Sequence, residues 1–259
     1  MKHTPMPSAK GVLYLVPAPL DFGCDETREL QATLPLGTLE VAAKLEHWVC
    51  ENAKSARAYL KRVDAVVPLQ HTLQSLSIVE LPRNVHKKGD HDGTFDASAL
   101  LQPAMQGHDM GLLSEAGMPA VADPGSSVVR SAHALGITVV PLVGPVSLLL
   151  ALAASGLNGQ NFAFVGYLPQ EPDDRAKRIR ELESLAQRSC QTQLFIETPY
   201  RNQALLQALL QTLHGNTRLC LSSGLTLTRA SVISQTVSQW KKQPMTADNA
   251  TPCLFLIGR

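Results

Sequence analysis

The sequence predicts an α/β protein of two domains, each with a largely parallel or mixed sheet covered by helices. Short β-rich runs alternate with helical patterns along its 259 residues, which is typical of sheets with helices on their faces. This length suits two domains of about 130 residues. Turn-forming residues at 156–161 follow a complete helical pattern, so the predicted domains are residues 1–158 and 159–259.

The first half opens on a buried strand at 11–16, which Pro17 and Pro19 end. A helix is expected at 51–62, where apolar residues recur near one face. Asp123 and Pro124 are predicted to cap and begin another helix, which Gly136 ends. The other predicted elements of this half are strands at 110–113 and 137–142 and helices at 96–106 and 146–155.

The second half repeats the alternation. Strands are expected at 162–165, 193–196, 218–221 and 253–257, with helices at 174–187 and 201–213. Between 221 and 253 the pattern is mixed and predicts no single element.

The composition indicates a globular chain without a strong net electrostatic field. Hydrophobic residues make up 44% and charged residues 17%, and the net charge is +1. Any contact with RNA therefore requires a local basic patch. The five cysteines are far apart and include no C-x-x-C, so no metal site is expected. Cys50, Cys220 and Cys253 stand in apolar runs and are expected to be buried thiols.

The longest apolar run, 146–154, is too short to span a bilayer, which takes about 20 residues. No membrane partner is expected, and the predicted location is cytoplasmic. His86, His91 and Asp92 form a metal-like cluster, although a solvated loop is the simpler interpretation of so polar a stretch.

Ligands of open α/β sheets bind at the carboxyl ends of strands, and three strand exits here have unusual compositions. Two prolines stiffen residues 16–20, although plain strand termination is the simpler interpretation of this segment taken alone. Residues 114–125 are rich in small residues, carry two carboxylates, and exceed the roughly two to six residues of ordinary βα loops. Residues 143–147 form a tight turn whose amides could face a carboxylate or an adenine edge. Neither a G-x-G-x-x-G after the first strand nor a P-loop pattern is present.

Taken in order, these segments resemble the tetrapyrrole methylase superfamily, the class III S-adenosylmethionine-dependent methyltransferases. The nearest branch is that of the bacterial 16S ribosomal RNA 2′-O-ribose methyltransferases. The resemblance is carried by residues 13–19 (LYLVPAP), 113–119 (LSEAGMP), 123–125 (DPG), 139–145 (VVPLVGP), 154–157 (ASGL), 166–169 (GYLP) and 197–201 (ETPYR). It implies two α/β domains with the cofactor cleft between them, usually in a homodimer.

The resemblance also implies a set of site residues. S-adenosylmethionine is the implied cofactor, and its implied contacts are Pro17, Pro19, Ser114, Glu115, Ala116, Gly117, Pro145, Val146, Ser147, Ile196, Leu225 and Thr226. If the acceptor is a ribose hydroxyl, a general base should help, and Glu51 and Glu115 are the candidates. Lys54 and Arg57 would polarise the acceptor or clamp a phosphate. A dipole-favouring carboxylate at a helix start is the alternative for Glu51.

The sequence departs from the ribosomal RNA branch at positions expected to face the acceptor. Residues 51–54 read Glu-Asn-Ala-Lys instead of Glu-Asp-Thr-Arg, residues 21–23 replace a Gly-Asn, Ser223-Gly224 replaces Arg-Glu, and Tyr200 replaces a histidine. Ribosomal RNA or the small ribosomal subunit is the expected partner. A methyltransferase for a tetrapyrrole-like or other small acceptor and a cofactor-binding relative without catalysis stay open.

One basic stretch is a candidate RNA-binding patch. It comprises residues 175–180, joined by Lys87-Lys88 and Lys61-Arg62. A solvated helix whose acidic residues compensate its dipole is the alternative interpretation.

Overall fold

The computed structural model describes residues 9–21, 23–83, 85, 93–243 and 245–259. The chain divides into two compact units, the first holding residues up to 22 and Arg28–Pro145, the second Gly23–Thr27 and Val146–Arg259. This division falls before helix α6 (Ser147–Ser155) rather than after it, because α6 packs on the second sheet. His86, Lys87, Lys88, His91 and Asp92 lie outside the described residues.

The first unit contains a parallel sheet of five strands in the order β3-β2-β4-β1-β5. Its strands are β1 (Val12–Val16), β2 (His47–Cys50), β3 (Ser77–Glu80), β4 (Met110–Leu113) and β5 (Thr138–Pro141). Because the strands are parallel, their carboxyl ends all lie at one edge of the sheet.

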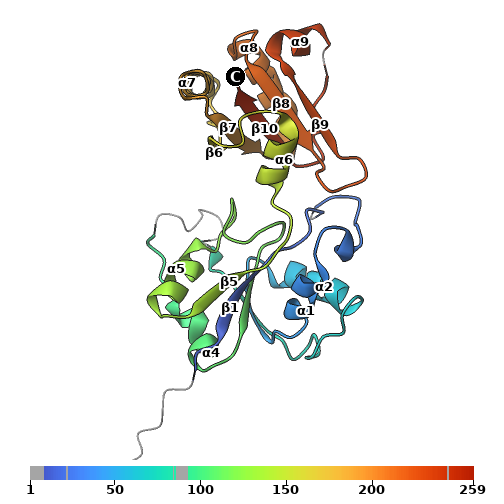
Figure 1. Cartoon of the computed structure of the whole chain (residues 1–259), viewed down its shortest axis with the longest axis vertical. Helices are drawn as coiled ribbons and strands as arrows, with labels where there is room; N and C mark the ends of the chain where they lie inside the picture. Colours follow the sequence, from blue (N-terminus) through green and yellow to red (C-terminus); the bar gives the residue numbers. More distant parts are fainter. Residues whose placement is uncertain (1–8, 22, 84, 86–92, 244) are drawn as a thin grey trace, which may run out of the picture. The chain divides into compact units, whose positions relative to one another are not determined.

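Helices cover both faces of this sheet (Figure 1). One face carries α1 (Leu36–Ala42) and α2 (Ala53–Asp64), together with the short η1 (Leu30–Ala32). The other carries η2 (Ser98–Leu101), α4 (Gln102–Met105) and α5 (Ser126–Ala134). Successive strand residues alternate between the two cores: Trp48 packs with α1 and α2, and Val49 with α4 and α5.

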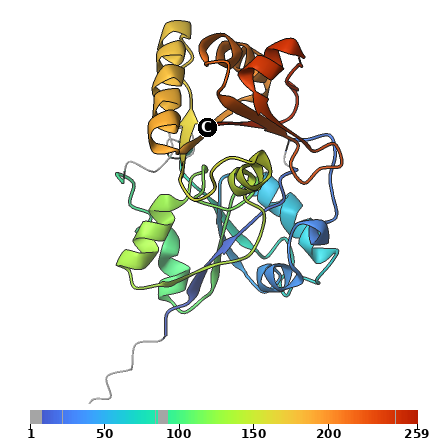
Figure 2. The ribbon, with the colours of Figure 1, turned by 45° about the horizontal axis from the view of Figure 1, so that its top comes forward.

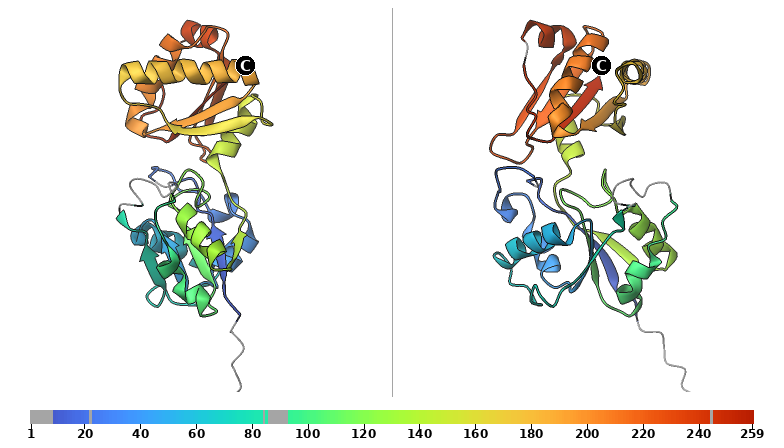
Figure 3. Two further views of the ribbon diagram at one scale, coloured as in Figure 1. Left: turned by 90° about the vertical axis from the view of Figure 1, so that its left-hand side faces the viewer. Right: turned by 180° about the vertical axis from the view of Figure 1, so that it is seen from behind.

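The second unit contains a mixed sheet in the order β6-β7-β10-β8-β9, in which only β6 and β7 are parallel. Its strands are β6 (Phe162–Tyr167), β7 (Thr192–Glu197), β8 (Arg218–Ser223), β9 (Ser231–Thr236) and β10 (Cys253–Gly258). The helices α7 (Pro172–Ser189), α8 (Asn202–Thr212) and α9 (Val237–Lys242) cover one face (Figure 2). The helix α6 packs on the other face, and Figure 3 shows α7 along its full length.

The predicted α/β class is confirmed, and most predicted elements exist within a few residues of their expected bounds. The predicted helix start at Asp123 is wrong. Helix α5 begins at Ser126 with Gly125 as its N-cap residue, because Gly125 has a φ of 134°, which no helical residue adopts. Helix α2 begins at Ala53 rather than at Glu51, because the Asn52 side chain accepts hydrogen bonds from the first-turn amides.

Two further differences concern the expected helix at 96–106 and the cysteines. The helix is a 3₁₀ turn followed by the single α-helical turn α4, because Pro103 lacks the N–H that a continuous helix needs. Cys50, Cys220 and Cys253 are buried as predicted. Over the described part of the chain, no helix is both long and apolar enough to cross a membrane.

Candidate functional site

Three strand exits meet at the carboxyl edge of the first sheet. β1 lies between β4 and β5 and is parallel to both, so the segments that follow these strands emerge side by side. The first two are joined directly, because Ala18 and Gly117 exchange backbone hydrogen bonds in an isolated β-bridge. The sequence predicted these segments as ligand loops, and the structure brings them together.

The third segment packs closely against the first two. A Cβ atom on Gly144 would lie 2.3 Å from Pro17 Cγ, so only glycine fits there. A Cβ atom on Gly117 would lie 3.4 Å from the carbonyl oxygen of Pro145. The Thr38 hydroxyl of α1 donates to the carbonyl oxygen of Val143 at 2.8 Å. The predicted residues Pro17, Gly117 and Pro145 are therefore neighbours.

Ser114 occupies the first position after β4 and is 4% exposed. Its hydroxyl has no hydrogen-bond partner among the residues that the structure describes. Leaving a buried polar group unpaired costs about 1–3 kcal/mol. A polar ligand atom that pairs with this hydroxyl would remove the penalty, which is the behaviour expected of a binding residue.

The loop after Ser114 stores backbone strain. Ala120 and Ala122 have φ values of 64° and 65°, in the left-handed region that costs an L-residue roughly 1–2 kcal/mol. Such outliers persist only where the surroundings enforce them, and they concentrate at functional sites. Asp123 follows Ala122 directly and interacts electrostatically with Glu51 and Glu115, which come after β2 and β4.

These three carboxylates form an acidic cluster. The backbone N–H of Glu115 donates to Glu51 Oε1 at 3.3 Å. The Ser55 hydroxyl of α2 donates to Glu115 Oε1 at 3.1 Å. Burial raises the pKa of Asp123 to about 7, and the negative charges of Glu51 and Glu115 act in the same direction. The cluster therefore combines a carboxyl that titrates near neutral pH with the two candidate bases.

Both predicted cations lie at the start of α2, on the same element as Ser55. Asn52 Oδ1 accepts from the backbone N–H of Lys54 at 2.8 Å and thereby fixes the first turn. The Lys54 and Arg57 side chains are exposed, and Arg57 donates to the carbonyl oxygen of Ala53 at 3.4 Å. An exposed cation beside a carboxylate cluster can contact an anionic acceptor while the carboxylates receive a proton.

In the second unit, Val146, Ile196 and Leu225 share one apolar cluster between α6 and the sheet, although they are far apart in sequence. Val146 is the N-cap residue of α6 and Ser147 is its first residue. Thr226 has a φ of 72°, which makes it another strained residue at a predicted position. Within this unit, three of the five predicted residues are therefore in one cluster.

The segment that follows β7 is held by a buried carboxylate. Glu197 is 5% exposed, and its Oε1 accepts from Arg201 Nε at 3.0 Å and from the terminal nitrogen Nη2 at 2.7 Å. The Arg201 guanidinium lies over the Tyr200 ring, 5.4 Å from its centroid. Tyr200 itself is 71% exposed.

The basic stretch of α7 is partly neutralised. Arg178 pairs with Glu181 at 3.1 Å, and Asp173 and Asp174 occupy the first turn. Lys177 and Arg180 are exposed. The structure thus shows two exposed cations together with the dipole-compensating acids of the alternative interpretation, and it is compatible with both interpretations.

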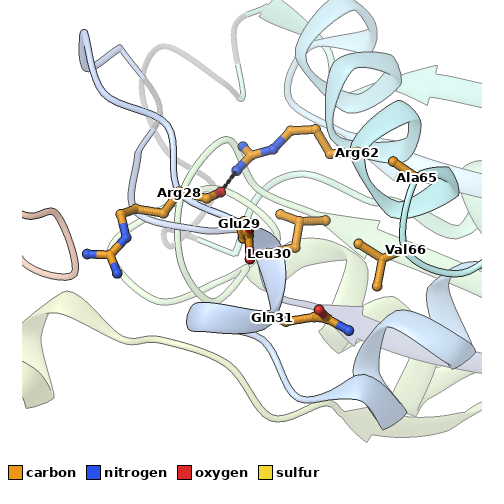
Figure 4. A pocket seen from close by; sticks show the side chains of 7 residues that line it. All are labelled: Arg28, Glu29, Leu30, Gln31, Arg62, Ala65 and Val66. Carbon is orange, nitrogen blue, oxygen red and sulfur yellow. Dashed lines mark hydrogen bonds between the residues drawn. The ribbon is translucent and has the colours of Figure 1, made fainter.

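A pocket of about 520 Å³ is lined by none of the predicted cofactor-binding or catalytic residues, but it includes Arg62 of the predicted basic patch. It is lined by Arg28, Glu29, Leu30, Gln31, Arg62, Ala65 and Val66 (Figure 4). Arg62 has a structural role here, because it holds both carboxylate oxygens of the buried Asp21, at 3.0 and 2.8 Å, and also donates to the Arg28 carbonyl oxygen.

Sequence reasoning missed two members of the site. Asp123 was assigned to a helix cap, although its position in an overlong loop after a strand was a usable signal. Ser55 carried no signal, because its contact with Glu115 depends on how α2 packs beside β4. Among the described residues, no group of three or more His, Cys, Asp or Glu is arranged to hold a metal ion.

Comparison with known families gives one match that covers most of the chain. The model of the family described as Tetrapyrrole (Corrin/Porphyrin) Methylases matches residues 51–240. Three similar curated proteins are all named ribosomal RNA small subunit methyltransferase I. The protein from Vibrio cholerae is 29% identical over 86% of this chain and 68% of its own length. The one from Escherichia coli O157:H7 is 26% identical over 93% and 76%, and the one from Bacillus subtilis is 29% identical over 90% and 70%.

Solved structures share the fold at lower identity. The methyltransferase CobJ superposes with a TM-score of 0.58 at 16% identity, covering 96% of this chain and 94% of its own. The uroporphyrin-III-C-methyltransferase from Thermus thermophilus superposes with a TM-score of 0.53 at 18% identity, with the same coverage of each chain.

Proposed function

Since the chain belongs to the tetrapyrrole (corrin/porphyrin) methylase family and is therefore a methyltransferase, we propose that it uses S-adenosylmethionine to methylate a ribose 2′-hydroxyl of ribosomal RNA. The observation that carries the cofactor assignment is the buried hydroxyl of Ser114, which lacks a partner in the described part of the chain and stands beside two further strand exits that meet at Gly117.

The residues present fit this cofactor chemically. Ser114 offers a hydroxyl without a partner among the described residues, and Gly117 and Gly144 let backbone approach closely. The carboxylates of Glu51 and Glu115 suit a cationic ligand. In the second unit, Val146, Ile196 and Leu225 provide apolar surface. We assign the cofactor contacts to the predicted residues of both units, which are Pro17, Pro19, Ser114, Glu115, Ala116, Gly117, Pro145, Val146, Ser147, Ile196, Leu225 and Thr226.

When bound, S-adenosylmethionine supplies an electrophilic methyl group on a sulfonium centre. The chain has to orient the acceptor hydroxyl, exclude water and receive its proton. Glu115 and Glu51 are the proposed proton acceptors, since both stand at the ends of strands and are connected by a hydrogen bond. Lys54 and Arg57 are proposed to hold a phosphate of the acceptor.

The names of the relatives support ribosomal RNA of the small subunit as the acceptor. The exposed Lys177 and Arg180 on α7 are proposed to contact its phosphates, with a homodimer as the functional form. If this is correct, neutralising these two residues should flatten the salt dependence of RNA binding. Light scattering tests the oligomeric state.

The deciding experiment maps ribose methylation in small-subunit RNA from cells with and without the gene, by mass spectrometry. One 2′-O-methyl group should disappear on deletion and return with the wild-type gene but not with a Ser114→Val, Glu115→Gln double variant. Calorimetric titration with S-adenosylhomocysteine tests the cofactor separately. An unchanged methylation map together with turnover of a corrinoid or porphyrin precursor would overturn the RNA assignment, and absence of binding heat would overturn the cofactor assignment.

A further inference from the structure

Two exposed tyrosines lie at the same edge of the second sheet. Tyr167 is the last residue of β6, Tyr200 follows the end of β7, and these two strands are parallel neighbours. The exposed fractions are 58% for Tyr167 and 71% for Tyr200. In the strand register Tyr167 pairs with Ile196, a proposed cofactor residue, so both tyrosines belong to the candidate site's edge of this unit.

Tyr200 is held in a defined orientation despite its exposure. It is the middle residue of the 3₁₀ turn Pro199–Arg201, whose first residue is a proline with a restricted φ. Arg201 covers the ring with its guanidinium and is anchored by two hydrogen bonds to the buried Glu197. An aromatic ring fixed in this way loses little conformational entropy on binding a planar ligand.

The charge around Tyr200 indicates which planar ligand fits. The Arg201 guanidinium is paired with Glu197 at 2.7 Å, so it offers little free charge to a phosphate or to the peripheral carboxylates of a tetrapyrrole. Unpaired nucleobases, in contrast, stack on aromatic rings and guanidinium planes without needing a counter-ion. Stacking of this kind contributes about 1–3 kcal/mol per base.

Building on the proposed function, we infer that Tyr200, with Tyr167 at the same sheet edge, stacks on unpaired bases of the RNA acceptor and so selects single-stranded RNA. This makes Tyr200 a specificity residue for the acceptor, apart from the carboxylates that receive the proton. Its contribution to binding depends on the base and only weakly on salt.

A fluorescent reporter tests the inference without requiring catalysis. The native tryptophans, Trp48 and Trp240, are 1% and 0% exposed, so they respond little to a surface ligand. In a Tyr200→Trp variant, a short single-stranded oligoribonucleotide should quench the new indole saturably. An abasic oligonucleotide of equal length should bind at least about fivefold more weakly, in line with the loss of one stacking contact.

Kinetics provide the second test. Tyr200→Ala should raise KM for the RNA acceptor about 5- to 100-fold, Tyr200→Phe should keep it near wild type, and the affinity for S-adenosylhomocysteine should stay unchanged in both. Phe162→Ala is the matched control, because Phe162 is 41% exposed but begins β6, at the opposite end of the strand.

Equal quenching by both oligonucleotides, no quenching, or quenching by a porphyrin but not by RNA would overturn the inference. A wild-type KM in Tyr200→Ala would do the same. The proposed function is judged separately, by the methylation map of the deletion strain, so either idea can fail alone.

Discussion

Ala18 and Gly117 exchange two backbone hydrogen bonds, with N···O distances of 2.9 and 3.0 Å. They join the segment after β1 to the loop after β4, and both belong to stretches in which cofactor contacts are proposed. Because the amides and carbonyls of the two segments are paired with each other, neither segment can move without the other. The first unit thus presents a preorganised edge to the proposed cofactor.

Replacing Gly117 by alanine should disturb this edge. Its φ of 74° costs an L-residue about 1–2 kcal/mol, and the added Cβ would lie 3.2 Å from Leu20 Cδ2. We expect Gly117→Ala to lower the stability of the first unit by roughly this amount and to weaken S-adenosylhomocysteine binding at least about tenfold. Urea unfolding and calorimetry measure the two effects.

Gly93 provides the control for this substitution. Its φ is 78°, and a Cβ atom added there would meet no described heavy atom within 4 Å apart from its chain neighbours. Gly93→Ala should show a similar loss of stability with normal cofactor affinity. If Gly117→Ala and Gly93→Ala bind S-adenosylhomocysteine equally well, the contact between the segment after β1 and the loop after β4 has no part in binding.

The acid–base assignment rests on Glu51 and Glu115. Glu115→Gln should lower turnover on the true acceptor about 100-fold at saturating S-adenosylmethionine, within the range that general bases contribute. Glu80→Gln is the control, since Glu80 ends the neighbouring strand β3 but accepts from the backbone N–H of Ala53 at 2.7 Å. Single-turnover measurements isolate the chemical step. Wild-type rates in both Glu51→Gln and Glu115→Gln would remove the general base.

The pair of Asp21 and Arg62 should be structural rather than catalytic. Asp21 is 6% exposed and is bound by both terminal nitrogens of Arg62. Removing one partner of a buried pair leaves an uncompensated charge, so Arg62→Met should cost roughly 2–5 kcal/mol in the free energy of unfolding. Arg178→Met breaks an exposed pair with Glu181 and should cost less than about 1 kcal/mol. Equal costs would contradict this contrast.

An element of this structure was predictable from the sequence where a short local pattern determines it, and was not where tertiary packing does. The strand at Val12–Val16 and the helix at Ala53–Asp64 were readable because a β-rich run and an apolar periodicity are local features. Strand β3 was missed, since its four residues are mostly exposed and lie at the sheet edge. Strand β9 was missed because all its residues are half-buried, which leaves no alternation to detect.

The candidate site divides in the same way. The three loops could be found from composition and length, and parallel strands bring their ends to one edge. The pairing of Ala18 with Gly117 depends on tertiary packing that no local pattern encodes, and so does the burial of the Ser114 hydroxyl away from any partner among the described residues. Asp123 was placed in a helix cap for the same reason: Gly125, two residues later, has a φ of 134° and packs so closely on Leu112 that an added Cβ would lie 3.1 Å from its Cδ2, and no local pattern indicates this packing.

Asp123 should make the stability of the first unit depend on pH. Its pKa is raised to about 7 by burial and by the charges of Glu51 and Glu115. Between the ordinary carboxyl pKa and about 7, the folded protein keeps a proton that the unfolded chain releases, so stability falls as pH rises through this window and levels off above it. Each pKa unit corresponds to about 1.4 kcal/mol, and partial solvent contact reduces the total to roughly 1–3 kcal/mol.

Urea unfolding of wild type and Asp123→Asn between pH 5 and 8 measures this loss of stability. The fluorescence of Trp48 is recorded in a Trp240→Phe background, so that the signal reports the first unit alone. The free energy of unfolding of Asp123→Asn should increase relative to that of wild type as pH rises. Asp96→Asn is the control, because hydrogen bonds from Ser98 lower the pKa of Asp96, so this carboxyl stays ionised over the measured window and its stability difference from wild type should be constant between pH 5 and 8. Its partner-stabilised carboxylate favours the fold above the ordinary carboxyl pKa and loses that effect as pH falls. A stability difference for Asp123→Asn that stays constant across pH 5 to 8 would show that this carboxyl is ionised throughout and that the acidic cluster is open to water.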